Sequence, residues 1–356
     1  MKTPLFIIFS FLFFIFGFHA VVAEMSHIKG NEDQLVTSLT QISFSKYPNA
    51  HNPSLIDTPE GVLLTFRWIP DLLLNPNVSH IGVVLLNELL EPISKPQLLN
   101  TRVGNKSIPS QSEDARVFSC QGSLYVIYND NDSLTNPTVL QRRDMFIARL
   151  SYVNNRFVLS EPVKLYHQEK YFTVKWQKNW IPFEWHDALL IGYSIIPHEV
   201  LYADLISGEC ISFVITPFAH PTWQWKWGLL RGGTPAMLVD GEYLAFFHST
   251  IVTSSDASNG VPMFHYYMGA YTFSNDPPFE VTHLTPFPII AKGFYTELTT
   301  SSASPWEPKK VIFPGGYVVR DKHLYLAYGK DDQEMWIATI DREKLKKALV
   351  PVSLLE

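Results

Sequence analysis

The fold is decided by the stretch Glu113-Asp114-Ala115-Arg116, which leads through the turn Gln121-Gly122-Ser123 into the apolar run Leu124-Tyr125-Val126-Ile127-Tyr128. The same order of polar or glycine-rich start, turn and dense apolar-aromatic strand recurs along the chain. The other copies begin at Asn52, Lys178, Arg231 and Phe313. A further strand often follows each copy. Multi-stranded units repeated every roughly 50–80 residues are typical of propellers, so the sequence predicts an all-β, five-bladed β-propeller.

A propeller brings a short segment of every blade to one axis, so polar residues at the blade starts should face one another. Charged side chains beside apolar strands are costly to bury unless they line a cavity or pair with each other. The candidates are Asn52, Arg67, Glu113, Asp114, Arg116, Lys178, Arg231, His248 and Asp332. A ring of several cations and a few carboxylates suits an anionic or polyhydroxylated ligand, and one acid among them could donate a proton.

Composition excludes some classes of function. The formal net charge is -6 and no basic run occurs, which argues against a nucleic-acid partner. No His/Cys/Asp cluster has the spacing of metal ligands, so no metal site is predicted. Aromatic residues make up 14% of the chain, which suits both β structure and stacking on sugars.

The N-terminus is typical of an export signal. Lys2 precedes an apolar stretch from Leu5 to Phe18, and Val21-Val22-Ala23 supplies the small residues of a cleavage site. We expect residues 1–23 to be a signal peptide and the mature protein to be secreted or periplasmic. The alternative is an uncleaved N-terminal membrane anchor, because the apolar stretch is nearly long enough to span a bilayer.

Residues 24–356 are expected to form a single propeller domain. We interpret residues 24 to about 45 as a polar lead-in, and residues 252–262 and 299–306 as exposed loops. The segment from Asp341 to Leu349 has helical periodicity, with Asp341 as the capping residue.

Two features of the sequence matter if the chain is exported: its two cysteines, which could form a disulfide, and its three Asn-x-Ser/Thr glycosylation sites. Cys120 and Cys210 could pair, although buried free thiols are favoured because a core of this size needs no bridge. Asn77, Asn105 and Asn131 would carry glycans in a eukaryotic secretory pathway.

Several segments resemble glycoside hydrolase family 130, which contains β-mannoside phosphorylases and hydrolases. The resemblance rests on Ser112-Glu113-Asp114-Ala115-Arg116, His248, Tyr266-Tyr267-Met268-Gly269-Ala270 and Tyr328-Gly329-Lys330-Asp331-Asp332. These segments occur in the family's order across nearly the whole mature chain. The resemblance implies a furanosidase-like five-bladed propeller, and related propellers include β-1,2-mannosyl transferases.

The resemblance also implies roles for individual residues. Asp114 matches the catalytic aspartate, the general acid, which in the phosphorylases acts through a substrate hydroxyl. Asp332 matches an aspartate that holds sugar hydroxyls. The other matches are pocket residues: Asn52, Arg67 and Arg116 near the −1 sugar and attacking group, Lys178 of a Lys-Asp element, the late His248, and Tyr266. Glu113 and Arg231 complete the predicted substrate-binding set.

The chain departs from the family pattern at several positions. Ala115 replaces a proline, Asn179 replaces the aspartate of the Lys-Asp element, and Phe247 replaces a tyrosine. Arg142 and Arg143 are candidates for the family's paired phosphate-binding arginines.

Structural interpretations compete with each functional one. Asp114 could form a salt bridge with Arg116, Lys178 and Arg231 could close blades by ion pairs, and His248 could be a satisfied core residue. The alternating Trp223, Trp225 and Trp227 suit either a sugar platform or, more simply, packing between blades. Core positions are expected for Trp176, Trp180 and Trp185.

The sequence therefore predicts a secreted carbohydrate-active enzyme that cleaves β-mannosides or similar glycans with inversion. Asp114 would protonate the glycosidic oxygen, while phosphate, or a water activated by Glu113 or Asp332, attacks the opposite face. Inorganic phosphate is a candidate co-substrate, and no other cofactor is expected. Export favours hydrolysis or transfer, because phosphorolysis conserves energy best inside a cytoplasm. The alternatives are a β-mannosyl transferase and a non-catalytic glycan-binding propeller.

Overall fold

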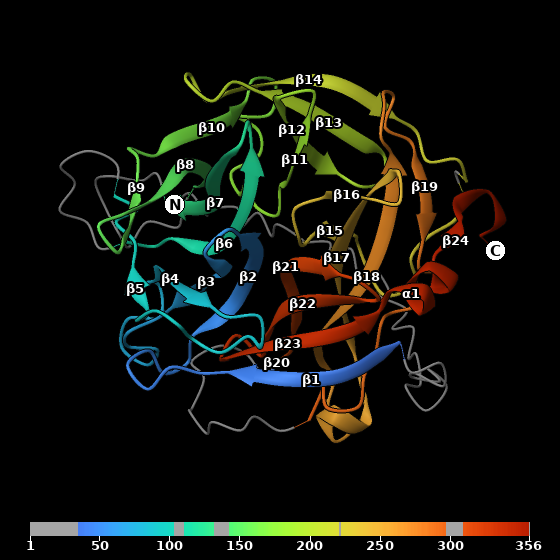
Figure 1. Cartoon of the computed structure of the whole chain (residues 1–356). Coiled ribbons are helices and arrows are strands. Elements are labelled where there is room, and N and C mark those ends of the chain that lie inside the picture. The colour runs from blue at the N-terminus through green and yellow to red at the C-terminus, as the bar shows by residue number, and fades with distance from the viewer. Residues whose placement is uncertain (1–34, 103–109, 132–141, 221, 297–308, 356) are drawn as a thin grey trace, which may run out of the picture.

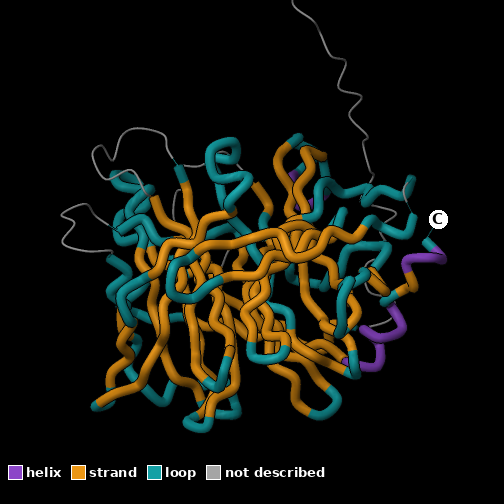
Figure 2. Tube along the Cα trace, turned by 90° about the horizontal axis from the view of Figure 1, so that it is seen from above, coloured by secondary structure: helices purple, strands orange, loops and turns teal. Residues whose placement is uncertain are grey.

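Short antiparallel sheets stand around a central axis in the computed structural model, which describes residues 35–102, 110–131, 142–220, 222–296 and 309–355 (Figure 1). The predicted all-β, five-bladed β-propeller is confirmed. The expected signal peptide and the expected loop at residues 299–306 lie outside the described residues. Seen from the side, the turns between strands gather at the two faces of the disc (Figure 2).

Each blade begins with an inner strand beside the axis, and in Figure 1 these strands surround the centre of the molecule. The inner strands are β2 (His51–Thr58), β6 (Glu113–Cys120), β11 (Ile181–Trp185), β15 (Arg231–Gly232) and β21 (Ile312–Arg320). Strand β2 contacts both β6 and β21, so the first, second and last blades meet at the axis. The polar starts of these strands are thereby brought to one end of the axis.

The remaining strands pair outward from the axis, mostly antiparallel. In blade 1 they are β3 (Gly61–Trp68), β4 (His80–Leu86) and β5 (Gln97–Leu98). In blade 2 they are β7 (Ser123–Asn131), β8 (Arg143–Val153), β9 (Arg156–Leu159) and β10 (Val163–His167). In blade 3 they are β12 (Ala188–Ser194), β13 (His198–Ala203) and β14 (Glu209–Thr216). In blade 4 they are β16 (Met237–Val239), β17 (Glu242–Thr253), β18 (Met263–Ser274), β19 (Val281–Leu284), β20 (Lys309–Lys310) and β24 (Val350–Pro351). Strands β10 and β14 pair in parallel and join the outer parts of blades 2 and 3.

Blade 5 is completed by a strand from the other end of the chain. Strands β22 (His323–Lys330) and β23 (Glu334–Asp341) follow β21, and β1 (Val36–Ile42) pairs antiparallel with β23, from Val36 opposite Ile340 to Ile42 opposite Met335. The expectation of a polar lead-in up to about residue 45 is therefore wrong for residues 36–42, while its first part, residues 24–34, lies outside the described residues. Strand β1 closes the ring because it supplies hydrogen-bond partners to an edge that would otherwise be open.

A long hairpin of β17 and β18 forms the centre of blade 4, with register from Glu242 opposite Ser274 to Thr253 opposite Met263. The predicted loop at residues 252–262 is thus shorter than expected, because Val252 and Thr253 belong to β17. A short 3-10 helix at Asp256–Ser258 lies within the remaining turn.

Aromatic and aliphatic side chains fill the spaces between blades. Trp225 and Trp227 are buried in one such cluster and Trp223 packs against it, which confirms packing rather than a sugar platform for these residues. Cys120 and Cys210 are buried free thiols, and burial raises the pKa of Cys120 to about 11 and that of Cys210 to about 12. Both thiols are therefore protonated and unreactive at neutral pH.

The C-terminal helix α1 (Arg342–Ala348) is present as predicted. The Asp341 side chain accepts a hydrogen bond of 3.0 Å from the backbone N–H of Lys344, which satisfies one free donor of the first turn. A 3-10 helix at Val352–Leu354 follows β24. Over the ranges that the structure covers, we find no helix with the length and apolar character of a membrane span.

Removal of the chain up to Ile42 tests ring closure. Without β1, the edge of β23 is open and the apolar contacts of Val36 and Ile42 are lost. We expect the free energy of unfolding to fall by about 3 kcal/mol or more, the scale of losing one large core side chain. A chain that begins at Leu35 is the control for denaturant unfolding. Equal stability of the two chains would show that β1 does not close the propeller.

Candidate active site

Bulges at the starts of the inner strands create the site. The antiparallel register shifts between His51 and Ser54 in β2, and between Glu113 and Arg116 in β6. The residues inside these bulges, Asn52 and Asp114, have left-handed backbones with φ of 49° and 54°. Asparagine and aspartate tolerate this conformation better than other L-residues. Strained backbones of this kind persist where the surrounding structure holds them, often at functional sites.

Glycine gives the room that Asn52 needs. A Cβ atom on Gly329 would lie 2.0 Å from Oδ1 of Asn52, closer than any real contact. The glycine of the Tyr328-Gly329-Lys330-Asp331-Asp332 segment therefore lets blade 5 approach the bulge of blade 1.

Asp114 is fixed by two neighbours from blade 1. Its Oδ1 accepts a hydrogen bond of 2.8 Å from Nδ2 of Asn52 and lies 3.7 Å from Nη1 of Arg67. The expected alternative, a salt bridge with Arg116 on the same strand face, is not what forms. The bulge breaks the two-residue alternation of the strand, and Arg116 bonds elsewhere.

Glu113 binds cations from three blades. Its Oε1 lies 2.8 Å from Nη2 of Arg67 and 3.0 Å from Nη2 of Arg143, and its Oε2 lies 2.6 Å from Nζ of Lys178. Burial alone would raise the pKa of this carboxyl, but Arg67, Lys178 and Arg143 lower it well below its ordinary range. Lys178 thus does join two blades by an ion pair, in addition to lying in the site.

The adjacent residues Arg142 and Arg143, the second of which begins β8, do not bind the same carboxylate. Arg143 points to Glu113 and donates a bond of 2.7 Å to the carbonyl of Gln111, whereas Arg142 binds Asp144 at 2.8 Å and lies 3.7 Å from the centre of the Tyr171 ring. The two arginines thus bind different carboxylates, and their candidate role as paired phosphate ligands stays a prediction.

Asp332 lies on the blade 5 side of the same cluster and forms an ion pair with Lys309 of β20. Burial would raise the pKa of Asp332, but the charges of Lys309, His51 and Arg67 lower it to about 2. Arg67 interacts with all three carboxylates, Glu113, Asp114 and Asp332, which together raise the pKa of its guanidinium although burial lowers it.

Arg116 crosses the axis toward blades 3 and 4. Its Nε bonds to the carbonyl of Gly233, and its Nη2 donates to Oδ1 of Asn179 at 3.2 Å and to the carbonyl of Gly232 at 3.4 Å. Its Nη1 is buried and has no hydrogen-bond partner among the residues described. Burial lowers the pKa of Arg116 to about 10, against the charge of Asp114, so the guanidinium remains charged at neutral pH.

His248 lies beside Arg116 and is buried. Its ring stacks on Tyr266 at 5.9 Å and contacts Phe313 at 4.7 Å, and Arg231 is opposite it in the pair of β15 and β17. Burial and the charges of Arg116 and Arg231 lower the pKa of His248 to about 3, so the ring is neutral at neutral pH. Its Nδ1 has no partner within the described ranges. The ring is therefore a core residue with one unsatisfied nitrogen.

All the predicted site residues thus lie in one connected cluster at the axis, although Arg231 itself is exposed. Sequence reasoning missed three members: His51 and Lys309 altogether, and Arg143 as a ligand of Glu113. Lys309 sits in a two-residue strand that has no periodicity to detect. His51 directly precedes Asn52, so its position in the repeat was the one signal that could have indicated it.

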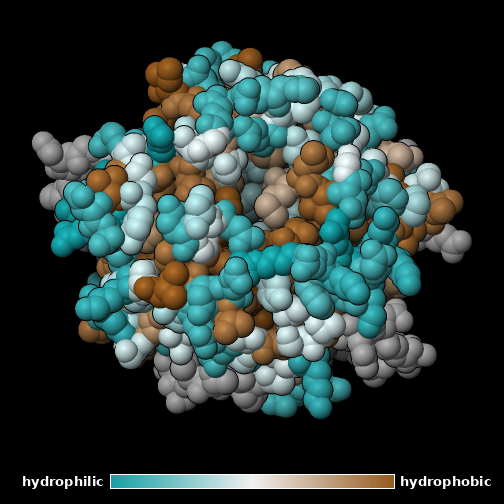
Figure 3. All heavy atoms as spheres, viewed as in Figure 1, coloured by the Kyte–Doolittle hydropathy of each residue, from teal (hydrophilic) through white to brown (hydrophobic). Residues whose placement is uncertain are grey.

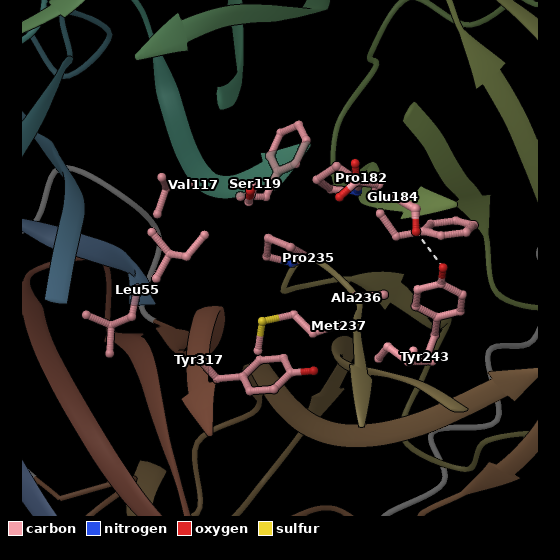
Figure 4. A pocket seen from close by; sticks show the side chains of 14 residues that line it. Leu55, Val117, Ser119, Pro182, Glu184, Pro235, Ala236, Met237, Tyr243 and Tyr317 are labelled. Atoms are coloured by element: carbon pink, nitrogen blue, oxygen red, sulfur yellow. Dashed lines mark hydrogen bonds between the residues drawn. The ribbon is translucent and has the colours of Figure 1, made fainter. Parts of the chain in front are cut away.

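The cluster is distinct from an apolar cavity on the same axis. That cavity has a volume of ≈ 350 Å³ and is lined further along the inner strands by residues that include Leu55, Val117, Pro182, Pro235 and Tyr317 (Figure 4). None of the predicted site residues lines it. The face seen in Figure 3 is hollowed near its centre, with apolar residues around the hollow. The predicted charged residues therefore lie outside this cavity, whose own lining includes one carboxylate, Glu184.

The described residues contain no group of three or more His, Cys, Asp or Glu side chains arranged to hold a metal ion. The arrangement offers instead one carboxylate, Asp114, held by an amide and a guanidinium. Beside it lie two carboxylates bound to cations. Four buried nitrogens of the cluster have no partner among the described residues: Nη1 of Arg116, Nδ1 of His248, Nε of Arg67 and Nε2 of His51. These groups can orient a polyhydroxylated ligand, transfer a proton and hold an anion.

Neither a protein-family model nor a curated protein matches the sequence. Solved structures do share its fold. One solved structure has a TM-score of 0.58 at 12% identity and covers 83% of this chain and 85% of that one. It was reported with the finding that the GH130 family of mannoside phosphorylases contains glycoside hydrolases that target β-1,2-mannosidic linkages in Candida mannan.

Two further structures extend the range of activities on this fold. A β-1,2-mannobiose phosphorylase from Listeria innocua has a TM-score of 0.55 at 13% identity and covers 89% of this chain and 97% of that one. A GDP-Man-dependent mannosyltransferase from Leishmania mexicana has a TM-score of 0.56 at 10% identity and covers 87% and 91%. The chain therefore has a divergent, GH130-like five-bladed propeller fold.

Replacing Glu113 with glutamine tests the buried ion cluster. The change leaves three cations without their shared anion, so we expect a loss of about 3 kcal/mol in the free energy of unfolding at pH 7. The folded-state pKa of Glu113 is lowered, so its stabilisation is present above the ordinary value of 4.5 and is lost as pH falls below it. The difference between variant and parent should therefore shrink below about pH 4.5.

Asp57→Asn is the matched control, because Asp57 is 46% exposed in its ion pair with Arg320. This variant should unfold like the parent at every pH. A Glu113→Gln difference that stays constant with pH would contradict the assignment.

Proposed function

We propose that this protein is a carbohydrate-active enzyme that cleaves β-mannosides or similar β-linked glycans with inversion, and that inorganic phosphate is the attacking group. The observation that supports the proposal is that Asp114 interacts with Arg116, which in turn interacts with His248. Nη1 of Arg116 and Nδ1 of His248 are both buried and have no hydrogen-bond partner among the described residues. The shared fold agrees with it, because structures with this fold include a mannobiose phosphorylase.

In this mechanism Asp114 supplies the proton that the departing sugar oxygen needs, directly or through a substrate hydroxyl. Asn52 and Arg67 hold Oδ1 of Asp114, so the other oxygen is directed to the substrate. Proton transfer is effective only when the acid is held within hydrogen-bond reach of the reacting oxygen. Asp332, Tyr266 and Arg231 would then hold hydroxyls of the sugar at the −1 position.

The state of the other carboxylates favours phosphate over water. An inverting hydrolase needs a second carboxylate that removes a proton from water. Glu113 and Asp332 are both bound to cations and have lowered pKa values, which makes both weak bases. Phosphate needs no such base, and a guanidinium with an unoccupied N–H is well suited to bind it. This state of the carboxylates favours phosphorolysis, against the expectation of hydrolysis or transfer that was based on export.

A second candidate is mannosyl transfer from a sugar nucleotide. The same unpartnered nitrogens could hold a diphosphate, and the Leishmania mexicana structure with this fold is a GDP-Man-dependent mannosyltransferase. A non-catalytic glycan-binding propeller would keep the hydroxyl-binding groups but would not depend on Asp114 for turnover.

If residues 1–23 are cleaved, the mature enzyme would act outside the cytoplasm, where Asn77, an exposed residue, could carry a glycan.

The activity is tested with β-1,2-, β-1,3- and β-1,4-linked manno-oligosaccharides, each with and without phosphate. We expect mannose 1-phosphate to form only with phosphate. Asp114→Asn should lower kcat by at least about 100-fold, because it removes the proton donor, while binding of the oligosaccharide persists. Mannose released without phosphate would indicate a hydrolase, and product formed only with GDP-mannose a transferase. Binding with no turnover of any substrate would indicate a glycan-binding protein.

Phosphate binding is tested separately by calorimetry with His248→Phe. Phenylalanine keeps the stacking on Tyr266 but removes both ring nitrogens. The neutral ring donates its one N–H to the backbone of Gly232, so the unpartnered Nδ1 would accept the O–H of hydrogen phosphate. We therefore expect the dissociation constant for phosphate to rise roughly tenfold, the loss of one good hydrogen bond. Asp114→Asn is the control and should bind phosphate at least as tightly as the parent, because it removes a negative charge. Unchanged phosphate affinity in His248→Phe would contradict the assigned anion site.

A further inference from the structure

Trp176 is an exposed aromatic residue at the edge of the charged cluster, contrary to the expectation of a core position. Its side chain is 53% exposed, whereas Trp180 is buried. The Nζ atom of Lys178 lies 5.3 Å from the centre of the Trp176 ring and 2.6 Å from Oε2 of Glu113. One ammonium group therefore connects the indole to the carboxylate that directly precedes Asp114.

The backbone on both sides of Trp176 is held in place. The N–H of Arg143 donates to the carbonyl of Lys175 at 2.8 Å, and the N–H of Gln177 donates to the carbonyl of Arg143 at 2.8 Å. Arg143 is itself anchored on Glu113 at 3.0 Å. A large aromatic side chain that is both exposed and held by its backbone loses little entropy when a ligand packs on it.

We propose that Trp176 is the stacking platform for the departing sugar of the glycan, and so determines which leaving group the enzyme accepts. The proposal rests on the proposed function. An indole presents a flat apolar face that matches the C–H face of a pyranose. The neighbouring Lys178, whose side chain is 26% exposed, would donate a hydrogen bond to a hydroxyl of the same sugar.

The position relative to Asp114 assigns Trp176 to the departing sugar. A general acid lies at the oxygen between the two sugars, and in an inverting reaction the attacking group approaches from the face opposite the leaving group. The groups assigned to the anion are Arg116 and His248. Trp176 is linked to Asp114 by a different set of contacts, through Lys178, Glu113 and Arg67.

The test compares substrates that do and do not have a departing sugar. Trp176→Ala should raise KM for a mannobiose roughly threefold to tenfold, the scale of one aromatic contact. The same variant should turn over β-mannosyl fluoride with unchanged kcat/KM, because fluoride leaves no ring to stack. Trp176→Phe should restore most of the affinity for the disaccharide. Phe213→Ala, which removes a 44% exposed aromatic side chain from outer strand β14, is the matched control and should behave like the parent.

Binding of mannobiose to the Asp114→Asn protein, with and without Trp176→Ala, is measured in parallel by calorimetry. Turnover that is the same with and without Trp176 would overturn the platform and leave the proposed function intact. Binding that depends on Trp176 in a protein without turnover would overturn the proposed function and leave the platform. If the protein shows neither binding nor turnover, both the platform and the proposed function are overturned. Equal KM changes for mannobiose and mannosyl fluoride would show that the ring only supports Lys178, and would also overturn the proposal.

Discussion

The buried carboxylate of Glu113 is the interaction on which the site depends. It holds Arg67 of blade 1, Arg143 of its own blade and Lys178 at the start of blade 3. None of these charges could be left alone at the axis, because an uncompensated buried ion costs several kcal/mol. The same contacts therefore fix the relative positions of three blades and orient Arg67 toward Asp114. One set of ion pairs therefore both joins these three blades and builds the site.

Backbone geometry decides which charged side chains at the axis remain able to bind a ligand. In a regular strand, Asp114 and Arg116 would lie on one face and neutralise each other. The bulge between Glu113 and Arg116 sends Asp114 toward Asn52, while Arg116 reaches the carbonyls of the blade 4 start. A one-residue irregularity thus separates an acid from a cation. Both remain able to meet a ligand, which is the condition for a site that handles a proton and an anion together.

The blades could be predicted from sequence because their inner and middle strands are apolar runs separated by turns. Strand β1 could not, because its apolar residues Val36, Leu39 and Ile42 are spaced by three, which is not the alternation of a strand. Its partner, β23, lies about 300 residues away along the chain, and the register spans Val36 with Ile340. The site residues were predictable as costly charges in apolar surroundings. Their pairing was not, since strand alternation placed Asp114 with Arg116.

The division of the axial polar groups into paired and unpaired ones bears on the reaction that this site could carry out. Hydrolases, phosphorylases and a transferase share this propeller, so the blades alone do not determine the chemistry. Here two of three carboxylates are engaged by lysine and arginine, whereas two guanidinium nitrogens and two imidazole nitrogens have no partner among the described residues. A site whose acids are mostly neutralised, but in which guanidinium N–H groups remain unpartnered, suits an anion, and this is the basis of our proposal that phosphate rather than water is the attacking group.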